Sequence, residues 1–123
     1  MQNPLPTQYK QAILHSAEAL LDEAAMFLQG LLRIPTINPP GDAYPECAAY
    51  IGEHLRILGY AVEYIALTPA EVAELAPYGA GLPRTNVFGR LDGPQGTPVL
   101  HFNGHMDVVP VSLGWSTHPF GGE

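Results

Sequence analysis

The residues of this chain with the clearest chemical potential are His105 and Asp107, which lie two positions apart in VLHFNGHMDVVP, residues 99–110. The apolar residues that precede them predict a strand over residues 98–103. Side chains at positions i and i+2 of an extended chain point to the same side. We therefore expect the imidazole and the carboxylate to share one face at the carboxyl end of a strand, where open α/β sheets bind ligands. A neutral imidazole is a good ligand for zinc or cobalt, and a nearby carboxylate can orient it.

The pair alone also fits a structural interpretation, with His105 as a satisfied polar residue and Asp107 as a turn former. Short motifs of this kind give many false positives. His101 has the same parity as His105 and is close enough in sequence to reach the site, but the pattern favours a flanking or core histidine. His118, in the loop over residues 114–122, is a weaker candidate ligand at the rim.

The remaining sequence predicts an α/β fold in one domain, because 123 residues are too few for two ordinary domains. The last two predicted strands are close enough to form a hairpin, whereas the first needs a longer connection. A mixed sheet covered by helices is the expected arrangement. The predicted elements are one amphipathic helix or two over residues 7–32, a helix over 44–58, a strand over 60–67, a short capped helix over 68–76, and strands over 86–91 and 98–103.

Composition excludes several classes of partner. The formal net charge is −7, and the five Lys and Arg residues are spread singly, so neither nucleic acid nor an anionic membrane surface is an expected partner. The one cysteine, Cys47, can form no internal disulfide and reads as a small buried residue. The N-terminal residues carry no apolar signal core, and no apolar run is long enough to span a bilayer. We expect a soluble, cytoplasmic protein.

Three strings, taken together, resemble a known family. They are GHMDVVP at residues 104–110, IPTINPPG upstream at 34–41, and Trp115 with Pro119-Phe120 downstream. In this order they resemble the dinuclear-zinc peptidases and deacylases that include acetylornithine deacetylase, succinyl-diaminopimelate desuccinylase, aminoacylase and glutamate carboxypeptidase. The resemblance covers residues 24–123 and leaves residues 1–23 as a helical extension.

The resemblance implies that residues 1–123 form the N-terminal part of a zinc-peptidase-like catalytic domain. His105 is then a ligand of one metal, and Asp107 is the catalytic carboxylate that orients it. The complete enzyme would hold two zinc ions, with cobalt as an option, and would hydrolyse an amide bond in a small N-acyl amino acid or peptide. The family's bridging aspartate, general-base glutamate and other ligands have no counterpart here. The general-base role is not transferred to Glu123, because the residues around it do not match that motif. A lid domain that makes homodimers in the family would also lie beyond this residue, so the chain alone is expected to be inactive and to bind zinc weakly.

Two other interpretations stay open from the sequence. One is a different metallohydrolase, such as a phosphoesterase, that uses a similar His-x-Asp pair. The other is a self-contained, non-catalytic α/β binding module, which should fold cooperatively and remain monomeric. A part of a larger catalytic domain should instead expose an apolar face and aggregate. Trp115 and Phe120 either line a substrate pocket or anchor their loop by burying apolar area, and the second is favoured.

Overall fold

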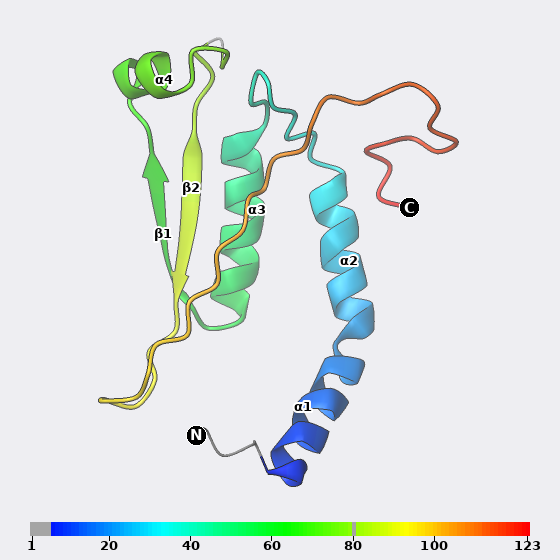
Figure 1. Cartoon of the computed structure of the whole chain (residues 1–123), viewed down its shortest axis with the longest axis vertical. Coiled ribbons are helices and arrows are strands. Elements are labelled where there is room, and N and C mark those ends of the chain that lie inside the picture. The colour runs from blue at the N-terminus through cyan, green and yellow to red at the C-terminus, as the bar shows by residue number, and fades with distance from the viewer. Residues whose placement is uncertain (1–5, 80) are drawn as a thin grey trace.

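The computed structural model describes residues 6–79 and 81–123, and within them it contains both helices and strands (Figure 1). This confirms the expected mixture of α and β elements. Each predicted helix, and each of the first two predicted strands, lies within about two residues of its expected position. The elements in chain order are α1 (Thr7–Ala19), α2 (Leu21–Leu32), α3 (Tyr44–Ile57), β1 (Ala61–Ala66), α4 (Pro69–Leu75) and β2 (Thr85–Arg90).

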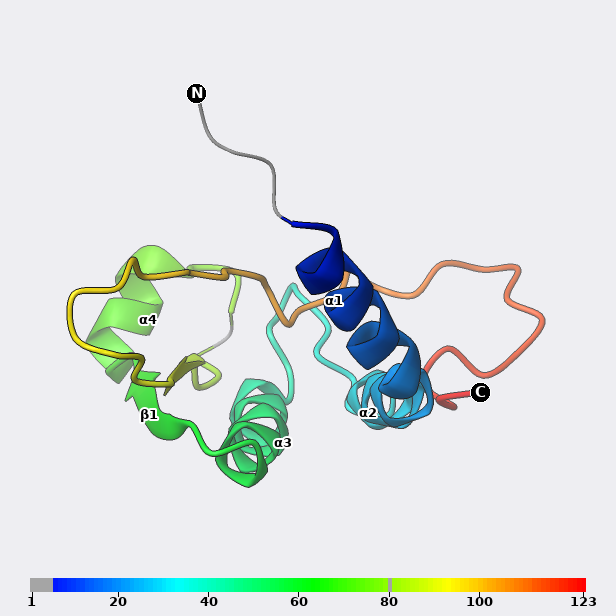
Figure 2. The ribbon, with the colours of Figure 1, turned by 90° about the horizontal axis from the view of Figure 1, so that it is seen from below.

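The sheet consists of β1 and β2, which pair antiparallel from Ala61 opposite Arg90 to Ala66 opposite Thr85. Helix α3 packs against both strands, and α2 lies beside α3 on the side away from β1 (Figures 1 and 2). Gly52 of α3 permits this close packing, because a side chain there would collide with the ring of Tyr64 on β1. The strands and α3 thus form one small packed unit.

Aromatic side chains join α2 to α3. The rings of Phe27 and Tyr50 stack with their centroids 5.4 Å apart, and His54 packs against both rings at 4.5 Å. The His54 Nδ1 atom lies 3.0 Å from the Tyr50 carbonyl oxygen. This cluster packs the second half of α2 against α3.

The amphipathic stretch over residues 7–32 forms two helices, and the break falls at Leu20. Helix α1 contains no buried residue, so its apolar side chains, such as Ile13 and Leu14, remain exposed. Across residues 6–79 and 81–123, the helices lack the length and apolar character that a bilayer crossing requires.

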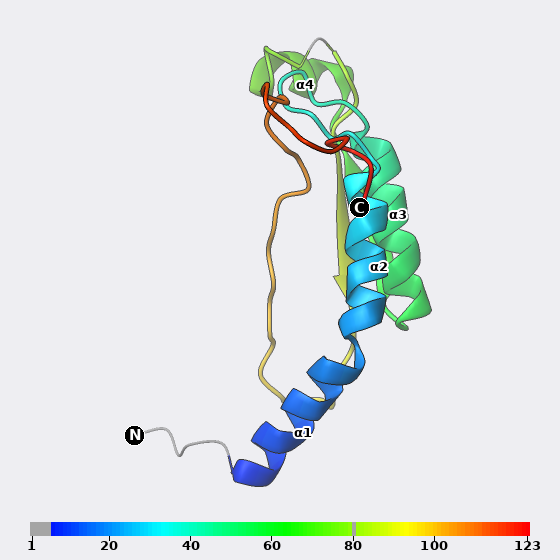
Figure 3. The same ribbon diagram turned by 90° about the vertical axis from the view of Figure 1, so that its right-hand side faces the viewer.

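The prediction of a strand over residues 98–103 is wrong, and so is the predicted hairpin. Residues 98–107 run as an extended segment that forms no strand with any described residue, and Figure 3 shows this segment standing apart from α2 and α3. The apolar alternation identified a chain that tends to be extended, but a strand also needs a partner for its backbone groups. The antiparallel pairing of β1 with β2 likewise replaces the expected mixed sheet. The parallel pairing that does occur is an isolated bridge between Ile37 and Val108.

Helix α4 begins with the predicted capping box. The Thr68 hydroxyl accepts a hydrogen bond from the Glu71 backbone N–H at 3.3 Å, and the Glu71 carboxylate accepts one from the Thr68 backbone N–H at 2.8 Å. The backbone and then the hydroxyl of Thr68 hold the pKa of Glu71 below its usual value. Both ends of the box satisfy donors that the first turn of a helix leaves unpaired.

We predict that Thr68→Ala raises the pKa of Glu71 part of the way back, since the backbone hydrogen bond remains. A carboxylate whose folded pKa is depressed stabilises the fold above its unfolded pKa, and this contribution is lost as the pH falls through the folded value. Carboxyl NMR titration measures the shift directly. Thr68→Ser keeps the hydroxyl and is the matched control; an equal shift in both variants would contradict the assignment.

Candidate functional site

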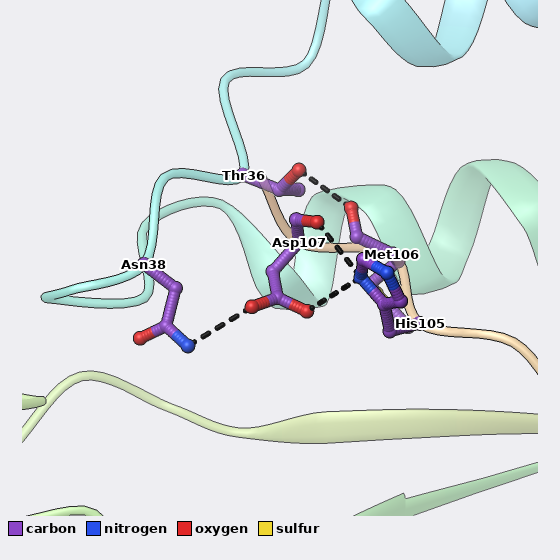
Figure 4. A network of polar contacts seen from close by, with 5 residues as sticks. All are labelled: Thr36, Asn38, His105, Met106 and Asp107. Carbon is purple, nitrogen blue, oxygen red and sulfur yellow. Dashed lines mark hydrogen bonds and ion pairs between the residues drawn. The ribbon is translucent and has the colours of Figure 1, made fainter. Parts of the chain in front are cut away.

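The loop after α2 holds the segment that carries His105 and Asp107. The Val108 backbone N–H donates to the Thr36 carbonyl at 2.9 Å, and the Asn38 backbone N–H donates to the Val108 carbonyl at 2.8 Å. The Thr36 hydroxyl, almost fully buried, donates to the Met106 carbonyl at 2.7 Å (Figure 4). Residues 36–38 therefore fix the backbone of residues 106–108, about 70 positions later in the chain.

His105 and Asp107 lie side by side, as the spacing predicts. The His105 Nδ1 atom lies 2.9 Å from the Asp107 carbonyl oxygen and 3.2 Å from Asp107 Oδ1. Both of these oxygens can only accept hydrogen bonds from a neutral ring, so the proton of the neutral imidazole belongs on Nδ1. The Nε2 atom then carries a free lone pair, through which a neutral imidazole binds a metal ion. The His105 side chain is 84% exposed and the Asp107 side chain 27%.

Asp107 is held as an anion. The Asn38 amide donates to Asp107 Oδ2 at 2.9 Å, and this hydrogen bond is the main cause that lowers the pKa of the carboxyl. Partial burial opposes the effect, while hydrogen bonding from its own backbone, Tyr44 and His105 adds to it. The carboxylate and partial burial together raise the pKa of the Tyr44 hydroxyl, with burial the larger cause. A charged acceptor therefore faces the imidazole across the neutral pH range.

Arg84, which directly precedes β2, fixes the turn that carries Asn38. Its guanidinium donates to the Gly41 carbonyl at 2.9 Å and to the Pro40 carbonyl at 2.5 Å. The same group lies over the ring of Tyr44, 4.6 Å from the centroid, where cation–π attraction adds to the contact. Gly41 has a φ of +96°, and a Cβ atom there would displace this guanidinium from its position.

A cavity of about 870 Å³ adjoins the pair. His105 and Asp107 contribute to its wall, which is otherwise largely apolar and comes from α2, α3, β2 and residues 101–120. His101 and Trp115 also line it. Trp115 is 60% exposed, so the expectation that it anchors its loop by burial is wrong. Phe120 is half-buried and lines the same cavity.

The described residues do not bring a set of metal ligands together around His105. Within the part of the chain that the structure describes, no group of three or more His, Cys, Asp or Glu side chains is arranged to hold a metal ion. Zinc in proteins takes three or four protein ligands. The tautomer of His105 suits a ligand, but these residues do not make a complete metal site.

Cys47 lines the same cavity, whereas the hydrogen bond of His118 lies within its own loop. Cys47 is buried, as predicted, and burial raises the pKa of its thiol, with the charge of Glu46 adding to the effect. His118 Nδ1 accepts a hydrogen bond from the Phe120 backbone N–H at 3.2 Å.

Asn38 and Tyr44 are the residues that the sequence did not reveal as partners of Asp107. Asn38 belongs to the string IPTINPPG, and no local pattern could connect it to a carboxylate 69 residues away.

The sequence of this chain is similar to those of enzymes that share one name. It is 33% identical over 101 residues to a succinyl-diaminopimelate desuccinylase of Novosphingobium aromaticivorans. This match covers 82% of this chain and 24% of the relative. Enzymes of the same name from Erythrobacter litoralis and Gluconobacter oxydans are 32% identical over 101 residues and 31% over 90 residues; the matches cover 81% and 73% of this chain. No family model and no solved structure matches it. The chain is thus similar to three desuccinylases and spans about a quarter of their length.

Proposed function

We propose that this chain is the N-terminal quarter of a metal-dependent amide hydrolase of the succinyl-diaminopimelate desuccinylase type. The substrate class is a small amino acid acylated on nitrogen, with a succinyl group as the first choice. The observation that carries this proposal is the position of His105 Nδ1, 2.9 Å from the Asp107 carbonyl oxygen and 3.2 Å from Asp107 Oδ1, which favours the Nδ1–H tautomer. The similarity to three desuccinylases supports the same assignment.

In this proposal His105 provides one ligand through Nε2, and Asp107 fixes the ring and increases its basicity as a ligand. A bound zinc ion would supply polarisation of the amide carbonyl and acidification of a water molecule. The other ligands and the general base would come from the further three quarters of the enzyme. The apolar cavity beside His105 would then be shared between this chain and those later residues.

The test is a chimera in which residues 24–123 replace the matching segment of the Novosphingobium aromaticivorans desuccinylase. We expect the chimera to release succinate from succinyl-diaminopimelate and a chelator to stop the reaction. The 123-residue chain alone should release none and should show only weak zinc binding in calorimetric titration, because a single imidazole cannot hold the ion.

The matched control is the same desuccinylase with the segment deleted, which should be inactive. Tight, stoichiometric zinc binding by the isolated chain would contradict the proposal, as would a folded chimera without amide hydrolysis. Phosphate release from phosphoesters by that chimera would favour a phosphoesterase instead.

A further inference from the structure

We propose that Asn38 is the positioning residue that selects the tautomer of His105, acting through the carboxylate of Asp107. This inference adds a role to the site described under the proposed function, and its relevance to catalysis rests on that function. All three residues of the arrangement, Asn38, Asp107 and His105, lie within this chain. Figure 4 shows the two hydrogen-bond connections in one line, from the Asn38 amide to Asp107 and from Asp107 to the His105 ring.

The two oxygens of Asp107 have separate partners. Oδ2 accepts from the Asn38 amide at 2.9 Å, and Oδ1 lies 3.2 Å from His105 Nδ1. A carboxylate turns readily about its last bond, since that torsion has a broad energy profile. With Oδ2 held by Asn38, the group cannot turn without losing a charge-assisted hydrogen bond. Oδ1 is therefore kept facing the imidazole.

Asn38 is well suited to this task because its own backbone is fixed to the same segment. Its N–H donates to the Val108 carbonyl at 2.8 Å, directly after the residue that its side chain holds. Arg84 fixes the carbonyls of Pro40 and Gly41 in the same turn. The amide thus approaches the carboxylate from a rigid support, which is what holding one oxygen requires.

The Asp107 carboxylate is the strongest restraint on the His105 ring. The ring is 84% exposed, so packing restrains it little. Its Nδ1 atom also lies 2.9 Å from the Asp107 carbonyl oxygen, but a neutral acceptor gives a weaker hydrogen bond than a carboxylate. The orientation of Oδ1 therefore decides how strongly the Nδ1–H form is preferred.

Thr36 provides a contrast within the same loop. Its hydroxyl donates to the Met106 carbonyl and does not touch the Asp107 carboxylate. A purely structural role for the loop predicts that Thr36→Val and Asn38→Ala disturb His105 alike. A positioning role predicts that, of these two variants, Asn38→Ala changes the ring and Thr36→Val does not.

The experiment is long-range ¹H–¹⁵N spectroscopy of the metal-free 123-residue chain at a pH where its histidines are neutral. These spectra report which ring nitrogen carries the proton, and His105→Gln identifies the signal. We expect the ratio of Nδ1–H to Nε2–H forms of His105 to fall about three-fold in Asn38→Ala, since one net hydrogen bond is lost from the network. Thr36→Val should leave the ratio within error of the wild-type value.

His54 serves as an internal reference, because its Nδ1 contact with the Tyr50 carbonyl lies in α3 and should be unchanged in a folded variant. If Asn38→Ala loses this signal, Asn38→Leu decides the question, since it keeps about the size of the side chain, removes the donor and adds no charge. An unchanged His105 ratio in the folded variant overturns the proposal, and so does an equal change in Thr36→Val. The amide hydrolase assignment is unaffected by either result, because it is tested on the chimera.

Discussion

His105→Ala in the desuccinylase chimera is expected to lower kcat/KM about a thousand-fold. The metal contributes several kcal/mol to catalysis in such enzymes, and each 1.36 kcal/mol corresponds to a factor of ten in rate. Loss of one ligand that is poised in the correct tautomer removes most of that contribution. Initial rates of succinate release over a range of zinc concentrations measure the effect.

Asp107→Ala should give a smaller loss of about ten- to a hundred-fold, because the carboxylate acts through the histidine and not on the metal itself. The matched control is His101→Ala, which removes an imidazole that lines the same cavity and that we place outside the ligand set. We expect little change in that variant. A loss at His101 equal to that at His105 would show that the cavity, and not the histidine–carboxylate pair, determines the activity.

The parts of this fold that sequence predicted correctly are those set by local signals. Helix α4 is an example, because the signals for its start, Thr68, Pro69 and Glu71, all lie within four residues. Helix α3 begins with a proline in its first turn and ends just before Gly59, which has a φ of +87°. Such signals act through hydrogen bonds and steric preferences between neighbours, so they need no knowledge of the rest of the fold.

The parts that sequence could not predict depend on distant partners. The alternation of residues 98–103 is typical of a strand, but this segment pairs with no strand among the described residues. The adjacency of His105 and Asp107 was predictable, because both belong to one extended segment. The hydrogen bond that Asn38 donates to Asp107 was not, since the parallel bridge between Ile37 and Val108 brings the two residues together.

The same extended segment leaves a large apolar surface uncovered. Val99, Leu100 and Phe102 are 92%, 78% and 84% exposed. Leu113 and Trp115 follow with exposures of 102% and 60%, whereas the buried apolar residues of the described part of the chain are Ile34, Cys47, Ala48 and Val72. Large apolar side chains that gather in an exposed state usually mark an interface. This surface supports the proposed catalytic domain, in which further residues would cover it.

We therefore predict that the 123-residue chain self-associates at micromolar concentrations, and that Leu100→Lys with Phe102→Glu shifts it to monomer. Burial of a leucine or phenylalanine side chain is worth about 1.5–3 kcal/mol, so two charged replacements should weaken association by a factor of about a hundred or more. Sedimentation velocity over a dilution series measures the change. The pair adds one charge of each sign, so the net charge of −7 is preserved.

Gln95→Lys with Gln11→Glu is the matched control, since it makes the same change in charge at two exposed polar positions. Self-association should persist in this variant, because the apolar surface of residues 99–102 is intact. A wild-type chain that remains a compact monomer at high concentration would contradict the prediction and would favour the binding module. Restoration of the monomer by both variants would assign the association to charge, and the uncovered apolar segment would then need no partner.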